Sequence, residues 1–219
     1  MLNQRLSHTA RQVRQQAGFS LVEMMIAMAL SLILFGGLLN AYVATVKSSS
    51  DLMVSAHLDN ELHKLLDMMA RDIRRAGTHG NPQALISASA NPFSVEGTGA
   101  YTGETANSCI TFSYDWDSDG VLDTGTPDER YGYRLKSGLV QTRTAGLACN
   151  ADGNPNWADV TDANTYTITG LQFVPTTLSA EEINVREVRI TLTAQLVTDA
   201  AVTRSLSKTV RVRNDLHNP

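Results

Sequence analysis

An acidic run in the middle of the chain has the side chains and spacing of a metal-binding loop. Residues 115–123 read DWDSDGVLD, with carboxylates at alternate positions followed by Gly120. Alternating carboxylates can converge on one hard cation, and a glycine permits the sharp turn of a calcium loop. The predicted Ca²⁺ ligands are Asp115, Asp117, Asp119, Asp123 and the main-chain carbonyl of Val121.

This loop departs from the calcium-loop pattern at its twelfth position. Thr126 stands where a bidentate glutamate belongs, although Asp128 or Glu129 could substitute for it. We therefore expect weak binding of the extracellular type. The alternative is an Asp/Gly-rich hairpin that holds no metal, but its clustered acids would repel one another without a counter-ion.

Sequence motifs of catalytic sites are lacking or incomplete. Asp123-Thr124-Gly125 resembles the active-site triplet of aspartic proteases, but those enzymes need two such carboxylates and the sequence has no second triplet. Of the five histidines, only His57 and His63 share a predicted helix, where they face different sides. There is no GxSxG, phosphate loop or HExxH. The sequence predicts a protein that is not an enzyme.

The chain has two cysteines, Cys109 and Cys149, with no CxxC and no adjacent histidine. This spacing does not suit zinc. If this region is exported, a disulfide that stabilises the fold by roughly 3–4 kcal/mol is the natural interpretation. Two buried free thiols are the alternative.

The N-terminal part of the chain is long and apolar enough to form a membrane anchor. Residues 19–46 contain one charged side chain, that of Glu23, and a run of about 20 apolar residues spans a bilayer as a helix. Arg5, Arg11 and Arg14 precede the run without any acid. This asymmetry predicts a cytoplasmic N-terminus, so that the chain after about Lys47 lies on the other side.

The position of Gly18 bears on how this segment is processed. A removed secretory signal would have its small residues after the apolar run, whereas Gly18 lies before it. Glu23 costs about 2.5–3.5 kcal/mol in an apolar helix and therefore needs a partner. Cleavage after Gly18 would place the new amine of Phe19 one turn away, in the same or a neighbouring chain. The alternative is an acid that snorkels to the interface.

The stretch GFSLVEMMIAMALSLIL resembles the processing segment of type IV prepilins and of the related type II secretion pseudopilins. The resemblance implies that a membrane aspartic peptidase cuts between Gly18 and Phe19, and that Phe19 is then N-methylated. It also implies that Glu23 sets the register against the next subunit's N-terminus.

Helical character continues beyond the apolar run. Leu58, Leu62, Leu65, Met69 and Ile73 form one apolar stripe, and Asp67 with Arg71 is a potential ion pair on the surface. Gly77 and Asn81-Pro82 end the helix, which is predicted over residues 19–76 with a possible bend at Gly36-Gly37. The stretch MARDIRRAGTHG resembles the helix end of PilW-type minor pilins.

The rest of the chain predicts a β-rich head. Strands are expected over residues 109–114, 131–136, 139–143, 165–174, 185–196 and 202–213, with loops over 83–108 and 144–164. The predicted fold class is α+β and pilin-like: a long N-terminal helix, transmembrane in its first half, packed on an antiparallel β-sheet head. The predicted divisions are a leader (1–18), the transmembrane half (19–46) and the amphipathic half (47–77) of the helix, and the head (78–219).

Charge argues against nucleic-acid binding. The whole chain has a formal charge of −4, and loss of the three leader arginines makes the remainder more acidic. The last two strands are locally basic, which we interpret as a solvated face rather than as a DNA-binding or subunit-binding surface.

The resemblance implies a minor pilin of the PilW group that takes part in type IV pilus assembly. The implied partners are other minor and major pilins, prepilin peptidase and the inner-membrane assembly platform. The protein would span the bacterial inner membrane once and then enter the pilus. A J-like minor pseudopilin of type II secretion, a calcium-dependent adhesive head and a secreted soluble protein are the alternatives.

Overall fold

The computed structural model describes residues 18–81, 91–152, 157–180, 183–213 and 216–217. The chain divides into two compact units, Met1–Leu52 and Met53–Pro219, which we describe separately. A single helix, α1 (Leu21–Arg75), contributes residues to both.

In the first unit, α1 carries the apolar run. The helix begins at Leu21 and passes through Gly36-Gly37 without interruption. Every residue from Leu21 to Leu52 other than Gly36 is exposed, including large apolar side chains along the whole run. Since no other described segment of this unit covers the run, its apolar surface must be buried by something other than this unit.

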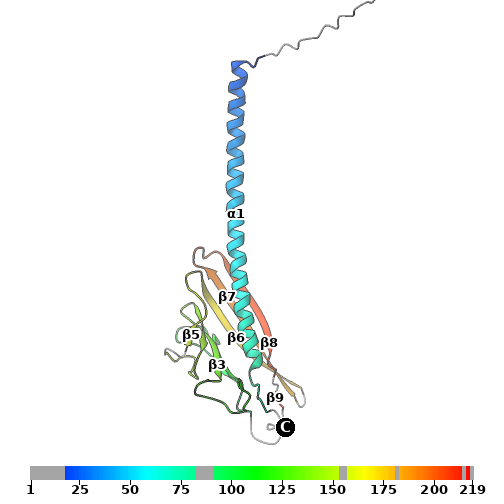
Figure 1. The fold of residues 1–219 in the computed structure, drawn as a ribbon, viewed down its shortest axis with the longest axis vertical. Coiled ribbons are helices and arrows are strands. Elements are labelled where there is room, and N and C mark those ends of the chain that lie inside the picture. The colour runs from blue at the N-terminus through cyan, green and yellow to red at the C-terminus, as the bar shows by residue number, and fades with distance from the viewer. Residues whose placement is uncertain (1–17, 82–90, 153–156, 181–182, 214–215, 218–219) are drawn as a thin grey trace, which may run out of the picture. The chain divides into compact units, whose positions relative to one another are not determined.

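In the second unit, the predicted apolar stripe of α1 packs on β-sheets (Figure 1). The stripe is buried, as the period of its residues predicts, and Leu66 and Ala70 widen it. The helix ends at Arg75, where Gly77 adopts a positive φ of 76° and donates its N–H to the carbonyl of Ser113 over 2.9 Å.

The first sheet has five antiparallel strands in the order β1-β2-β3-β4-β5. Their bounds are β1 (Val95–Gly99), β2 (Cys109–Ser113), β3 (Arg130–Lys136), β4 (Leu139–Arg143) and β5 (Trp157–Asp159). The tight turn predicted between β3 and β4 is present, with positive φ angles at Ser137 and Gly138.

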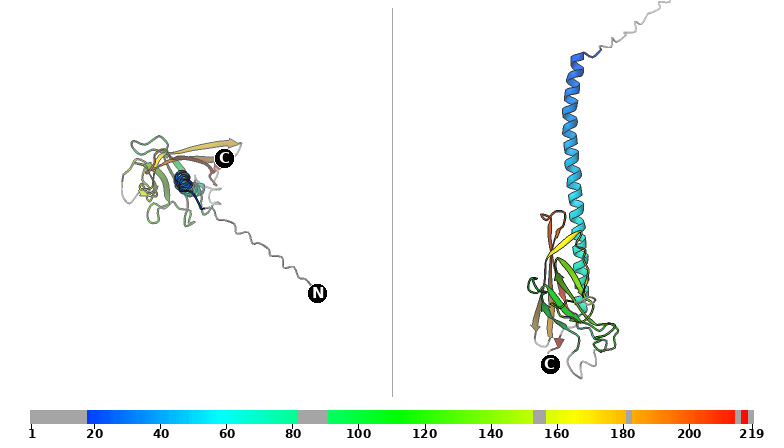
Figure 2. Two further views of the ribbon diagram at one scale, coloured as in Figure 1. Left: turned by 90° about the horizontal axis from the view of Figure 1, so that it is seen from above. Right: turned by 90° about the vertical axis from the view of Figure 1, so that its left-hand side faces the viewer.

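The second sheet has four strands: β6 (Tyr166–Ala180), β7 (Ile183–Leu196), β8 (Thr203–Arg211) and β9 (Leu216–His217). Strands β6, β7 and β8 are neighbours in that order, and β9 pairs with β7. The alternation along β7 is as predicted, since Val188, Ile190, Leu192, Ala194 and Leu196 are all buried. Figure 2 shows these strands from two further directions.

One hydrophobic core joins α1 to both sheets. It contains Leu62 and Met69 of the helix, Phe112 of the first sheet, and Phe173 and Ile190 of the second. The antiparallel sheets packed on a long apolar helix confirm the predicted α+β, pilin-like fold.

Polar contacts also attach α1 to the first sheet. The hydroxyl of Tyr133 donates a hydrogen bond to Asp72 of the helix, and the guanidinium of Arg75 lies 4.1 Å from the ring centre of Tyr114. Burial raises the pKa of the Tyr133 hydroxyl, as does the hydrogen bond to Asp72, so the hydroxyl stays a donor.

Several predictions about the head are corrected. There are two sheets rather than one. Strands β1 and β5 lie in segments that we predicted to be loops. The sequence did not indicate them as strands, because both are short and lack alternating apolar residues. Strand β6 continues past its predicted last residue, Val174, and β7 begins before its predicted first residue, Val185. Asp67 forms its ion pair with Lys208 of β8 rather than with Arg71.

Candidate functional site

The N-terminal segment places Phe19 and Glu23 at the start of α1. Phe19 is exposed, and α1 begins two residues later. The N–H of Ser20 donates a hydrogen bond to Oε2 of Glu23 over 3.2 Å. This is one half of a capping box, in which an acid three residues after the cap residue satisfies an unpaired N–H. The sequence analysis missed this role, which the pattern S-x-x-E at Ser20 signals.

The apolar part of α1 has the properties of a membrane segment. By length and composition alone, the helix is long and apolar enough to cross a membrane. Glu23 is the only charged side chain between Phe19 and Val46. The cleavage, methylation and pairing roles of Gly18, Phe19 and Glu23 remain predictions from the sequence.

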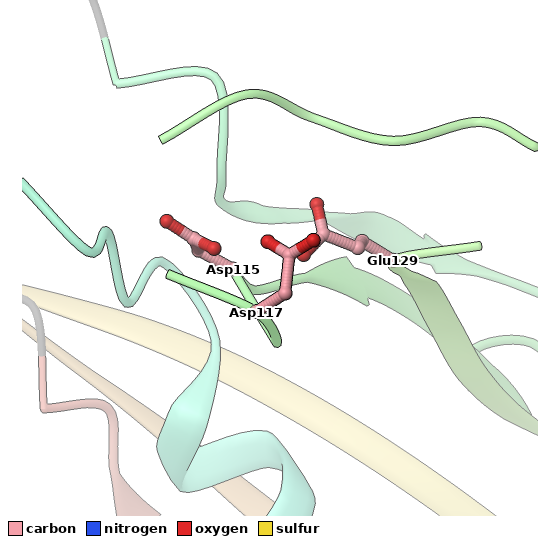
Figure 3. Close-up of side chains that lie close together, drawn as sticks. All are labelled: Asp115, Asp117 and Glu129. Atoms are coloured by element: carbon pink, nitrogen blue, oxygen red, sulfur yellow. The ribbon is translucent and has the colours of Figure 1, made fainter. Parts of the chain in front are cut away.

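The acidic loop forms two overlapping groups of carboxylates. Oxygens of Asp115, Asp117 and Glu129 lie within 4.8 Å of one another, as do oxygens of Asp117, Asp119 and Asp123. Figure 3 shows the first group, in which Glu129 comes from the far side of the loop. Asp117 belongs to both groups and is exposed.

Asp115 organises the loop through backbone donors. It is buried, and its two oxygens accept N–H bonds from Gly80 at 2.7 Å, Ser118 at 2.6 Å and Gly120 at 2.9 Å. Desolvation by burial raises the pKa of Asp115, but these backbone donors outweigh it and leave the pKa below its usual value. Asp115 is therefore ionised at neutral pH.

Glu129 closes the loop from the other end. It is fully buried and accepts N–H bonds from Trp116 at 2.6 Å and from Asp123 at 3.0 Å. Of the two acids that the sequence offered in place of the missing glutamate, the structure brings Glu129 to the group. Asp128 instead binds Arg130, over 2.6 Å between Oδ2 and Nη2.

The remaining predicted ligands differ in their surroundings. The N–H of Val121 donates to Oδ1 of Asp119 over 2.7 Å, and the N–H of Asp119 donates to Oδ1 of Asp117 over 3.3 Å. These local bonds leave other carboxylate lone pairs open. These open lone pairs would allow the loop to accept a hard cation. The backbone hydrogen bonds to its carboxylates also hold the loop together without a cation.

The two cysteines are joined. Cys109 of β2 and Cys149 form a disulfide with Cα atoms 5.9 Å apart, which confirms the predicted bond and excludes the free thiols. The bond attaches Cys149, which lies after β4, to β2 of the first sheet. There the buried Arg134 donates to the carbonyls of Cys149 and Ala151 over 2.9 and 2.7 Å.

The basic residues of the last strands partly face α1. Nε of Arg204 lies 3.3 Å from Oδ1 of Asp59, and Lys208 pairs with Asp67. These exposed pairs contribute little energy, and they form because β8 packs beside the helix.

Comparisons with known proteins agree on one group. Residues 51–212 match the model of the family described as prepilin peptidase-dependent protein B, and residues 13–39 match the prokaryotic N-terminal methylation motif. The chain is similar to an uncharacterized protein of Haemophilus influenzae, with 26% identity over 162 residues that cover 56% of this chain and 67% of that protein. It is also similar to prepilin peptidase-dependent protein B of Escherichia coli, with 26% identity over 163 residues that cover 73% of this chain and 78% of that protein. No solved structure matches significantly.

Proposed function

This chain belongs to the prepilin peptidase-dependent protein B family, and from that premise we propose that it is a minor pilin taking part in type IV pilus assembly. It is pilin-like and carries an N-terminal methylation motif. Both family matches support a structural, pilin-like role for the chain.

The observation that carries the proposal is the exposed apolar surface of α1. The helix has no charged side chain from Met24 to Val46, and nothing described in the first unit covers it. Such a surface is stable in lipid or among similar helices, but not in water. A subunit with this helix can leave the membrane only if other helices replace the lipid, which is what assembly into a filament provides.

Processing follows from the same segment. We propose that prepilin peptidase cuts between Gly18 and Phe19, and that Phe19 is N-methylated. The match to the methylation motif over residues 13–39 supports both steps. The arginines before Gly18 favour a cytoplasmic N-terminus in the inner membrane before assembly, with the head periplasmic and later part of the pilus.

Glu23 supplies the specific contact of assembly. An acid in an apolar bundle needs a partner, and the amine of Phe19 in a neighbouring subunit is the cation that the motif offers. The partners proposed are therefore other minor and major pilins, with prepilin peptidase and the inner-membrane assembly platform acting earlier.

The proposed subgroup is the PilW group, supported by the helix end MARDIRRAGTHG. The alternative is a J-like minor pseudopilin of a type II secretion system, which shares the same N-terminal chemistry. Deletion of the gene separates them: loss of piliation with normal protein secretion supports the pilus, and the reverse result supports the secretion system.

A second candidate is a calcium-dependent adhesive head. The convergence of Asp117, Asp119 and Asp123 oxygens within 4.8 Å favours it, because these residues have the alternation of a calcium loop. Binding of cells to surfaces with and without chelator, in strains with wild-type protein and with Asp117→Asn, tests it. An equal chelator effect in both strains would exclude the loop as the cause.

A further inference from the structure

We propose that α1 pairs with α1 of a second copy of this chain inside the membrane, through the side chain of Asn40 beside Gly36 and Gly37. The inference rests on the proposed membrane position of the apolar run, and it concerns the stage before a subunit enters a filament. Asn40 lies outside both family matches, which cover residues 13–39 and 51–212.

Asn40 has hydrogen-bonding groups that its own helix does not use. The hydroxyls of Ser31 and Thr45 donate to backbone carbonyls of α1 over 2.9 and 2.8 Å. Nδ2 of Asn40 donates to the carbonyl of Gly36 over 3.0 Å. An amide has two N–H groups and an oxygen, so one N–H and Oδ1 of Asn40 remain, and the described residues offer neither a partner. Tyr42 lies nearer the end of the run, where tyrosine reaches the interface.

The depth of Asn40 makes these unused groups costly. A rise of about 1.5 Å per residue places Asn40 about 24 Å after Met24 and about 9 Å before Val46 along the helix. In a hydrocarbon core about 30 Å thick, Asn40 then lies roughly 6–9 Å inside the boundary. Asparagine lacks the long stem with which lysine and arginine reach the interface. A partner for its amide must therefore come from within the membrane.

Gly36 and Gly37 give another helix access to Asn40. Both precede it by about one turn, and a Cβ added at either would meet nothing within 4 Å. Neither has a positive φ, so neither the packing nor the backbone of this chain requires glycine there. Glycine weakens a helix, but on a membrane helix it lets the backbone of a neighbour approach closely. A side chain as short as that of Asn40 needs such an approach to bond across an interface.

The second helix is identified by the chemistry and the depth of Asn40. An amide is complementary to itself, because the free N–H of each copy can donate to Oδ1 of the other. All copies of the chain insert in the same orientation, since all carry the same basic N-terminus. A two-fold axis along the bilayer normal therefore brings both Asn40 side chains to the same depth. The reciprocal pair satisfies the unused groups of both copies, which lipid cannot do.

Energy transfer between labelled copies in vesicles measures this pairing. Ser50→Cys provides one site for a dye beyond the apolar run, because the two natural cysteines are joined in a disulfide. The full-length protein, labelled with either donor or acceptor, is placed in phosphatidylcholine vesicles at a series of protein-to-lipid ratios. We expect energy transfer that saturates as this ratio rises and that falls when unlabelled wild-type protein is added.

Four variants locate the contact. Asn40→Leu removes both reciprocal bonds and should weaken the association about tenfold or more. Asn40→Gln keeps an amide and should associate within about threefold of the wild type. Gly36→Leu should weaken the association about as much as Asn40→Leu, because its side chain holds the helices apart. Thr45→Val, which loses a hydroxyl already bonded to its own helix, is the matched control and should associate normally.

Flotation of the protein with the vesicles tests the membrane segment separately. A wild-type chain that does not float contradicts the proposed function. A chain that floats but gives no more energy transfer than Asn40→Leu overturns the pairing and leaves the proposed function intact. The same holds if unlabelled protein does not compete, or if Thr45→Val weakens the association as much as Asn40→Leu. In those cases Asn40 serves the helix of a different protein or no helix.

Discussion

The N–H of Ser20 donates a hydrogen bond to Oε2 of Glu23 over 3.2 Å in the first turn of α1. Glu23 thus satisfies the N–H of the cap residue Ser20 and is also the single charged side chain of an apolar segment. One backbone N–H uses one of the several lone pairs of a carboxylate. The group therefore has a partner within its own chain and still has the capacity to bind an amine from another.

We predict that Glu23→Ala inserts into the membrane as the wild type does but enters filaments at least about tenfold less. Loss of one partner from a buried charge pair costs about 3–5 kcal/mol, and tenfold corresponds to only 1.4 kcal/mol. Immunoblots of sheared filaments and of the membrane fraction measure both quantities.

Glu23→Gln separates the two roles of this side chain. Its amide oxygen can still accept the N–H of Ser20, but it carries no charge for an amine. We expect it to fail in assembly as Glu23→Ala does. Asp51→Ala, which removes an acid outside the apolar run, is the matched control and should assemble normally. Normal incorporation of Glu23→Ala would refute the pairing role.

Loss of the disulfide should loosen the head. We predict that the double variant Cys109→Ser, Cys149→Ser lowers the free energy of unfolding by about 3–4 kcal/mol, mainly because the unfolded chain regains freedom. The segment that supplies carbonyl acceptors to Arg134 is also released. Urea unfolding in micelles, followed by tryptophan fluorescence, gives the value. A change below about 1 kcal/mol would contradict this account of the segment.

Asp128 should make the stability of the head depend on pH. Desolvation raises its pKa, but the hydrogen bonds and charge of Arg130 outweigh this and hold the pKa below the usual value. An acid with a lowered pKa stabilises the fold above its unfolded pKa of about 3.9, and this contribution is lost as pH falls through the folded pKa.

Asp128→Asn should therefore be less stable than wild type at pH 7, by about 1.5–3 kcal/mol for a hydrogen bond to a charged group. The difference should shrink as the pH falls below about 4. Urea unfolding of both proteins at pH 7, 5, 4 and 3 measures it. A difference that stays constant over this range would show that the charge of Asp128 contributes nothing.

Calcium binding by the acidic loop is tested by calorimetric titration of the full chain in micelles. We predict a dissociation constant of about 10⁻⁴–10⁻³ M, as in extracellular calcium modules. Asp117→Asn should abolish the binding, because Asp117 belongs to both carboxylate groups. Asp162→Asn is the control. Absence of heat from the wild type would leave the loop as a hairpin held by its own backbone bonds.

The elements that follow a regular period could be predicted from the sequence. The stripe from Leu58 to Ile73 and the alternation from Val188 to Leu196 are buried as expected, since each pattern has one geometrical solution. Strand β1 could not be found in this way. Its sequence VEGTG has two glycines and no alternation, and it is a strand because β2 offers it an edge to pair with.

The site was predictable where its residues are adjacent in the chain. The spacing of Asp115, Asp117 and Asp119 predicts the loop. That Glu129 rather than Asp128 joins the carboxylate group could not be predicted, because it depends on the ion pair between Arg130 and Asp128. Likewise, the ion pair between Asp67 and Lys208 joins residues far apart in the chain. Only the packing of β8 on α1 brings them together.

The most direct test of the proposed function is mass spectrometry of the intact chain recovered from sheared, purified filaments. The account predicts a polypeptide that begins at Phe19 with one added methyl group on its amine and retains the whole of α1. A chain that begins after Val46, or one that is absent from filaments and present as a free monomer in the periplasm, would contradict it.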